Sequence, residues 1–443
     1  MTQGLGTRHA PSWRLIQAHF GLGVAGLIAF AAALAVCAPS LQGFFFQPVL
    51  LGLVHLCVLG WLMPIAIGAL HQLVPVVFQV PVRSERLAWA AFALYVVGAP
   101  GLIAGFFTLD TSEPAGLLLP VSATLTALAL LLYAANLLAT LGGAGFARNG
   151  RSPQGGALAK SARRTLTGVH VHAALCWLSI AVMLGALMAW NLRAPFLPLF
   201  HVSVLRAHAH AAALGFFGLL IMGVAYRLLE MFLLSYGAPE RAGWLGFFAV
   251  NAAVLLLGAS FFGAGDILLR AGVASAAVGV AAFAVQVRAI FIRRTKRRID
   301  VSWQHTATSI AYFALALAAG GTLALVPVGE PWWDRLHVAY ALLAIPGFIG
   351  TIVVAQLYKI LPFLVWLHRF SQFVGLKKVP AASELLPEAP KRVQYFAMHI
   401  GLAALVAGVL ADCAPLRTGG AVLFAGSALL FARNLGVIYA RQP

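Results

Sequence analysis

The sequence has very little charge. Only 9% of its 443 residues are Asp, Glu, Lys or Arg, whereas 61% are apolar. This balance excludes an ordinary soluble domain, in which about a quarter of the residues are charged. Apolar runs long enough to cross the ~30 Å hydrocarbon layer of a bilayer recur along the whole chain. The sequence therefore predicts an all-α polytopic membrane protein.

We expect about twelve transmembrane helices in a single integral membrane domain, residues 1–443. Their approximate limits are 13–37, 45–78, 87–108, 116–145, 166–190, 199–233, 243–263, 267–290, 303–326, 333–366, 393–412 and 419–438. The first apolar run is long and lacks a cleavage site, so we expect a membrane span there rather than a signal peptide.

Cysteine is scarce as well, with four residues that stand singly. No CxxC pair, CxxCH haem-attachment motif or zinc-type spacing occurs. These absences argue against covalent haem and thiolate metal sites, so histidine should hold any cofactor. Cys37 and Cys413, near the predicted outer face, are the one pair open to a disulfide, although single cysteines more often fill cores.

Familiar catalytic motifs are missing too. We find no phosphate loop, dinucleotide fingerprint, nucleophile triad or peptidase zinc motif. Glu230 stands at a helix end, and four other acidic residues lie in or beside predicted outer loops: Asp110, Glu113, Asp266 and Glu330. Without a chain of buried acids, coupled proton pumping is not expected.

The charge that is present is mostly positive. The 30 Lys and Arg outnumber the 12 Asp and Glu and give a net charge of +18. Most basic residues fall in the termini and in loops after even-numbered spans, such as Arg293–Arg298. The positive-inside rule then predicts a bacterial-type inner membrane protein with both termini in the cytoplasm. Basic short loops favour the lipid bilayer, not nucleic acid, as the partner.

A threefold repeat is the strongest positive signal. Three stretches align: His55-LCVL-Gly60-Trp61-x6-Gly68-AL-His71-QLV-Pro75, His210-AAAL-Gly215-Phe216-x6-Gly223-VA-Tyr226-RLL-Glu230 and Gly347-Phe348-x6-Ala355-QL-Tyr358-KIL-Pro362. Repeats at fixed spacing indicate repeated architecture. We therefore expect three pseudo-equivalent groups of four helices, here called copies 1 to 3, at about 13–145, 166–290 and 303–438.

Histidines fall inside these spans, where polar nitrogens need partners that lipid does not offer. The outer layer contains His55 and its repeat equivalent His210, together with His208, Arg206 and the shallower His337. His208 and His210 are two residues apart and should point to different sides of their helix, so one ion cannot readily bind both. One of them can be a ligand and the other a helix contact.

The inner layer repeats as well. His19, His172 and His305 open the first helix of each copy, which should bring them near His71, Tyr226 and Tyr358 of the next helix. Hydrogen-bonded pairs that hold neighbouring helices together are the simpler interpretation. A metal site or proton path is the alternative, and His19 with His71 is the best candidate for it because both can be ligands.

The twelve spans, the threefold grouping and the second-helix motif resemble the catalytic subunit of haem-copper oxidases and nitric oxide reductases. The likeness in motifs is confined to the second helix of each copy. It implies that His55 is an axial ligand of a low-spin b-type haem, with His337 or His210 as the second ligand. It also implies that His208 or His210 corresponds to a copper ligand. Arg417, expected in the loop before the last span, would pair with a haem propionate, with Arg335 and Arg270 as alternatives.

The chain also departs from that family. The seventh span has no His-His pair, and Leu342 occupies the third-copy position of His55. A complete oxygen-reducing haem-copper centre is therefore not expected. The resemblance implies a protein that binds haem b, with copper as a second candidate cofactor. Its expected role is electron transfer or nitric oxide or oxygen handling, with an electron-donor or accessory subunit as a candidate partner.

Two other functions remain open. Histidines in two layers, with Met63, Met222 and Cys57 between them, suit a protein that transports or handles copper or another soft metal. A cofactor-free membrane assembly factor is the other alternative. In that case His55 and His210 would tolerate Gln or Asn with little effect beyond stability.

Overall fold

The protein is all-helical, as expected. The computed structural model describes residues 9, 11–109, 116–142, 165–197, 201–296, 299–326, 329–330 and 332–443, and no strand occurs among them. Twelve of its helices are long and apolar enough to cross a membrane. The prediction of a polytopic membrane protein with twelve spans is confirmed at this level.

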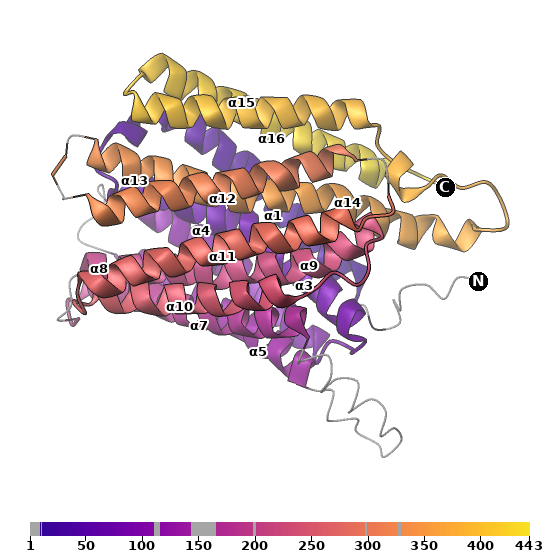
Figure 1. Cartoon of the computed structure of the whole chain (residues 1–443), viewed down its shortest axis with the longest axis horizontal. Coiled ribbons are helices and arrows are strands. Elements are labelled where there is room, and N and C mark those ends of the chain that lie inside the picture. Colours follow the sequence, from indigo (N-terminus) through magenta and orange to yellow (C-terminus); the bar gives the residue numbers. More distant parts are fainter. Residues whose placement is uncertain are drawn as a thin grey trace. The chain divides into compact units, whose positions relative to one another are not determined.

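The twelve spans follow one another along the chain (Figure 1) and are assigned to the predicted copies 1 to 3 by their order. Copy 1 has α1 (Trp13–Val36), α2 continued by α3 (Pro48–His55, Met63–Phe78), α4 (Glu85–Phe107) and α5 (Leu118–Gly142). Copy 2 has α7 (Leu166–Arg193), α8 continued by α9 (His201–His210, Leu219–Leu233), α10 (Arg241–Phe261) and α11 (Asp266–Ile292). Copy 3 has α12 (Val301–Leu325), α13 continued by α14 (Trp333–Leu342, Thr351–Arg369), α15 (Glu388–Leu410) and α16 (Ala414–Ala440).

Helix starts follow from local sequence. Ser84, Thr165 and Asp300 each accept a hydrogen bond from a backbone N–H two or three residues into the helix that follows. Such N-caps satisfy backbone donors that a helix end leaves open. Asp300 also forms an ion pair with Lys359 of α14, which ties the start of α12 to its neighbour.

The third and fourth helices of every copy pack together as a pair: α4 with α5, α10 with α11, and α15 with α16. Figure 1 shows α15 and α16 side by side. Small residues permit the close packing, as where a Cβ at Gly401 would lie 2.6 Å from the backbone nitrogen of Phe424. Close backbone approach of this kind is typical of helix pairs in membranes.

Packing divides the chain into two compact units. Unit 1 contains the residues up to Gly23 together with Met63–Lys296, and unit 2 contains Val24–Leu62 together with residues from Arg297 to Pro443. The unit boundaries cut through the first two helices of copy 1. Each unit is described separately below.

Two predicted boundaries were wrong at the end of the chain. The last two spans begin at Glu388 and Ala414, each five residues before the predicted start. Lys391 and Arg417 lie inside these helices and are buried. Arg417 is therefore part of α16 and does not lie in a loop.

Candidate functional site

Each second helix is interrupted at the same place by a π-helical stretch. These three π-segments are Leu56–Leu62, Ala211–Gly218 and Leu343–Gly350. His55, His210 and Leu342 stand immediately before them. Single π turns inside α-helices occur frequently at functional sites. In copy 3, Pro346 has no N–H to donate to the preceding turn, which accounts locally for the change in helix type.

A glycine inside each π-segment contacts the first helix of the same copy. A Cβ added at Gly26 would collide with the carbonyl of Gly60. A Cβ at Gly215 would lie 2.7 Å from Trp177, and one at Gly347 would lie 3.2 Å from Tyr312. Gly26, Trp177 and Tyr312 are thus equivalent positions in the three first helices.

The outer-layer histidines of copies 1 and 2 are held alike. The Nδ1 atom of His55 lies 2.7 Å from the carbonyl oxygen of Leu51, and that of His210 lies 2.8 Å from the carbonyl oxygen of Arg206. A carbonyl oxygen only accepts, so Nδ1 donates its hydrogen and Nε2 carries the lone pair. This is the tautomer in which a histidine ligates a metal through Nε2. Both rings are half-buried.

His208 and His210 face different neighbours. His208 Nδ1 donates to the carbonyl of Ala181 in α7 at 2.8 Å, whereas the His210 ring packs against Phe261 of α10 at 5.1 Å. The two-residue spacing therefore separates the rings, as expected. His208 makes the contact between helices, and His210 matches His55.

The remaining outer-layer residues have protein partners. The His337 ring stacks on Phe45 with centroids 4.2 Å apart, and its Nδ1 donates to the carbonyl of Trp333 at 3.0 Å. Arg206 supplies its backbone carbonyl to His210. Arg270 is exposed.

Arg417 has an anchoring role. Its guanidinium donates to the carbonyl of Ala38 at 3.0 Å and to Gln42 at 2.8 Å, and lies 3.5 Å from Asp412. Asp412 also lies 3.9 Å from Arg335. A buried arginine held in this way ties the start of α16 to the 3-10 helix Ala38–Gln42 that follows α1, within unit 2. Its Nη1 is buried without a hydrogen-bond partner, and the pairing of Arg417 with a propionate stays a prediction.

The inner layer of copy 1 is a cluster of His19, His71 and Tyr133, all in unit 1. The Nδ1 atoms of the histidines donate to the carbonyls of Leu15 and Ile67, at 2.7 and 2.9 Å. Both Nε2 atoms therefore carry lone pairs. His19 Nε2 lies 2.7 Å from the Tyr133 hydroxyl, and His71 Nε2 is buried without a hydrogen-bond partner.

In copy 2, the inner-layer histidine is His170, and the expectation of His172 was wrong by two residues. The His170 ring lies 5.5 Å from that of Tyr226, edge to face. A Cβ at Gly223 would collide with His170, just as one at Gly68 would lie 2.9 Å from the Cβ of His19. His172 instead is half-buried and donates to the carbonyl of Gly168. His170 Nε2 and the Tyr226 hydroxyl are both buried without a hydrogen-bond partner.

In copy 3 the inner layer is a continuous hydrogen-bonded network within unit 2. His305 lies 3.1 Å from His399 and 3.2 Å from Gln394, and His399 lies 3.2 Å from the Tyr312 hydroxyl. Further bonds join Gln394 to Tyr358 at 3.3 Å and Tyr358 to Asn434 at 3.0 Å. The expected nearness of His305 and Tyr358 is present, with centroids 6.3 Å apart.

Sequence reasoning missed four members of this network: Tyr312, His399, Gln394 and Asn434. They lie on α12, α15 and α16, outside the repeated second-helix motif. Each is a polar residue within an apolar span. That pattern was the available signal, because lipid offers such residues no partner.

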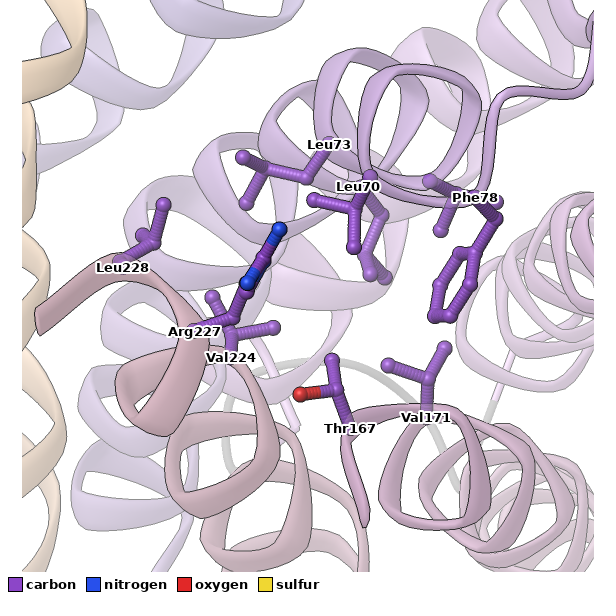
Figure 2. A pocket seen from close by; sticks show the side chains of 10 residues that line it. Leu70, Leu73, Phe78, Thr167, Val171, Val224, Arg227 and Leu228 are labelled. Atoms are coloured by element: carbon purple, nitrogen blue, oxygen red, sulfur yellow. The ribbon is translucent and has the colours of Figure 1, made fainter. Parts of the chain in front are cut away.

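A groove lies elsewhere, in unit 1. It has about 280 Å³ of space, partly open to the surroundings, and is bounded by α3, α7 and α9. Figure 2 shows its apolar walls, with the Arg227 side chain reaching toward Leu70 and Leu73, and Thr167 below. None of the predicted histidines lines it.

A second space lies within unit 2. It has about 190 Å³ and is lined by Trp61 of the first π-segment and by Gln394 of the copy 3 network, among others. Trp61 packs on the third π-segment, where a Cβ at Gly350 would lie 2.6 Å from its ring. Both spaces are smaller than the roughly 300–1,000 Å³ of typical ligand pockets.

Among the residues that the structure describes, no three His, Cys, Asp or Glu side chains are grouped to hold a metal ion. The four cysteines are free thiols, so Cys37 and Cys413 are not joined. No family model matches the sequence, and no curated protein is significantly similar to it. The candidate sites therefore stand on their geometry.

Proposed function

We propose that this multi-pass membrane protein holds b-type haem through His55 and acts in electron transfer or in the handling of nitric oxide or oxygen. One observation carries the proposal. His55 and His210 stand at matched positions before π-segments, with Nδ1 donating to a backbone carbonyl and Nε2 left as an acceptor. An imidazole prepared in this way suits haem iron.

The donor atoms fit such a cofactor. His337, in the same unit as His55, is the candidate for the second axial position, and His210 is the equivalent ligand of copy 2. Copper is the second candidate cofactor, with His208 or His210 as its ligand in copy 2. Arg417 stays the candidate for a haem propionate, because its Nη1 is buried without a hydrogen-bond partner although the rest of its guanidinium is held by Ala38 and Gln42.

Bound haem would supply a one-electron couple whose potential depends on the axial ligand and on burial. The chain itself contributes the fixed imidazole tautomer and an apolar surrounding. An electron-donor or accessory subunit would deliver the electrons, and no proton pumping is proposed. The placement of Lys and Arg supports a bacterial-type inner membrane with cytoplasmic termini.

A reduced-minus-oxidised absorption spectrum of the detergent-purified protein tests the proposal, with an iron and copper assay on the same sample. We expect sharp α and Soret bands that His55→Ala removes. His172→Ala is the matched control, because His172 also donates from Nδ1 to a carbonyl four residues earlier but precedes no π-segment. That variant should retain the bands.

A colourless preparation despite ample haem supply would contradict the proposal, as would a His55→Ala protein with unchanged bands. The copper assay would then separate metal handling from a cofactor-free role in assembly. Shifts of the Soret band with carbon monoxide or nitric oxide would separate gas binding from electron transfer alone.

A further inference from the structure

The inner-layer cluster of copy 1 has more hydrogen-bond acceptors than donors. His19 and His71 each use Nδ1–H on a backbone carbonyl, so two Nε2 lone pairs remain. One hydroxyl hydrogen, that of Tyr133, serves His19. His71 is fully buried, and its Nε2 has no partner. A buried acceptor without a partner costs about 1–3 kcal/mol. The cluster therefore has room for one more hydrogen-bond donor or for a cation.

The other two copies carry different groups at this level. In copy 2, the Nε2 of His170 and the Tyr226 hydroxyl are both buried without a hydrogen-bond partner, so one acceptor and one donor stay open. In copy 3, both ring nitrogens of His305 and both of His399 are hydrogen-bonded, and the open buried acceptor is Oδ1 of Asn434. Copy 1 differs because a second imidazole, His71, stands where the others carry Tyr226 and Tyr358. Among the three inner layers, copy 1 therefore pairs two imidazoles and leaves a nitrogen of one of them open.

The spacing of the two rings is that of two imidazoles on one ion. The His19 and His71 ring centroids are 5.9 Å apart, and Tyr133 stands edge-on to both at 5.5 and 5.6 Å. With metal–nitrogen distances of about 2.0 Å, two imidazoles on one ion have centroids about 5 to 6.3 Å apart. Gly68 holds His19 close to α3, since any Cβ there would meet the His19 side chain.

Charge and coordination number select the ion. Zn²⁺ needs about four ligands, and no acidic or cysteine side chain joins this cluster among the described residues. A double charge in an apolar interior also costs more to bury than a single one. Cu⁺ carries one charge, is stable with two or three ligands, and binds imidazole.

We propose that His19 and His71 bind one Cu⁺ through their Nε2 atoms, with the Tyr133 oxygen as a weak third ligand. On binding, the Tyr133 hydroxyl gives up its hydrogen bond to His19 and keeps its proton. The site lies wholly in unit 1 and does not depend on haem at His55.

The test is an anaerobic Cu⁺ titration of the purified full-length protein, with bicinchoninate as the coloured competitor. His71→Tyr should bind one equivalent fewer than the wild type, because it installs the residue that copies 2 and 3 carry. His172→Tyr is the control and should keep every equivalent. Haem absorbance read from the same samples reports the His55 proposal separately.

X-ray absorption on the copper-loaded wild type guards against a folding defect in the variant. We expect two imidazole nitrogens near 2.0 Å, and no sulfur. A wild type that binds no Cu⁺, an equal count in His71→Tyr, or a shell of sulfur from Cys57, Met63 or Met222 would each overturn the proposal.

Discussion

The inner layers of copies 1 and 3 occupy equivalent helices but use their polar groups differently. In copy 3, His305 belongs to a network that reaches from Tyr312 to Asn434 and satisfies both nitrogens of both rings. In copy 1, His71 keeps one buried nitrogen open. Copies 1 and 3 therefore have polar residues at equivalent positions, but they differ in whether the ring nitrogens of those histidines are hydrogen-bonded.

The outer layers of copies 1 and 3 also differ at equivalent positions. His55 of copy 1 immediately precedes its π-segment, and its Nδ1 donates to the carbonyl of Leu51, whereas copy 3 has Leu342 at that position and retains the π-segment. Copy 3 thus holds its helices with a polar network and has Leu342, not an imidazole, immediately before its π-segment. Copy 1 carries the residues that suit ligands, and this difference can be tested by substitution.

The largest effect is expected where the copies differ in helix contact. Gly26→Leu should destabilise the protein by about 3 kcal/mol. The new Cβ would collide with the carbonyl group of Gly60, and a backbone group cannot move aside as a flexible side chain can. Gly21→Leu, in the same helix but with no atom within 4 Å, should be tolerated. Thermal unfolding followed by fluorescence-detected size exclusion compares the two. Equal losses would show that the contact is not what limits α1.

A second comparison sets His305 against His71. His305→Leu should destabilise by about 1–3 kcal/mol, because it leaves the half-buried His399 ring without its hydrogen-bond partner and removes the hydrogen bond to the buried Gln394. His71→Leu should stay within about 1 kcal/mol of the metal-free wild type, because it removes a nitrogen that already lacks a partner. Unfolding midpoints in detergent with a copper chelator measure both. A larger loss for His71→Leu would mean that its Nε2 has a partner after all.

The smallest effect concerns the tyrosines at equivalent positions. Tyr358→Phe should cost about 1 kcal/mol, since its hydroxyl bonds to Gln394 and Asn434. Tyr226→Phe should be neutral or stabilising by a similar amount, since its buried hydroxyl has no partner. Side-by-side unfolding midpoints of the two variants decide the matter. If Tyr226→Phe proved the more damaging of the two, the open donor assigned to copy 2 would be wrong.

Much of the architecture could be predicted because lipid imposes a simple rule. Long apolar runs must be helices, so the twelve spans were found from composition alone. The last two starts were missed because Lys391 and Arg417 resemble loop residues, although both form hydrogen bonds with other protein groups inside the bundle. Hydropathy along the chain does not show which hydrogen-bond partners a charged side chain will find once the helices have packed.

The histidine sites were harder to predict. The prediction of His172 for copy 2 was wrong because spacing does not show which residue of the helix meets Gly223, and that residue is His170. Spacing along one helix does not fix its axial register against the next. The copy 3 network was missed for a related reason, since His399 and Asn434 come from helices without the repeated motif.

The π-segments also set the angular phase of each second helix. An α-helix turns about 100° per residue, so His210 and Tyr226 would stand about 160° apart on an unbroken one. The π-segment between them fits more residues into each turn and removes part of that rotation. Accordingly, both side chains face α10, His210 at Phe261 and Tyr226 at Gly243 and Gly246. One helix thus presents both polar layers to a single neighbour, and deleting one residue from Ala211–Gly218 would turn them out of alignment.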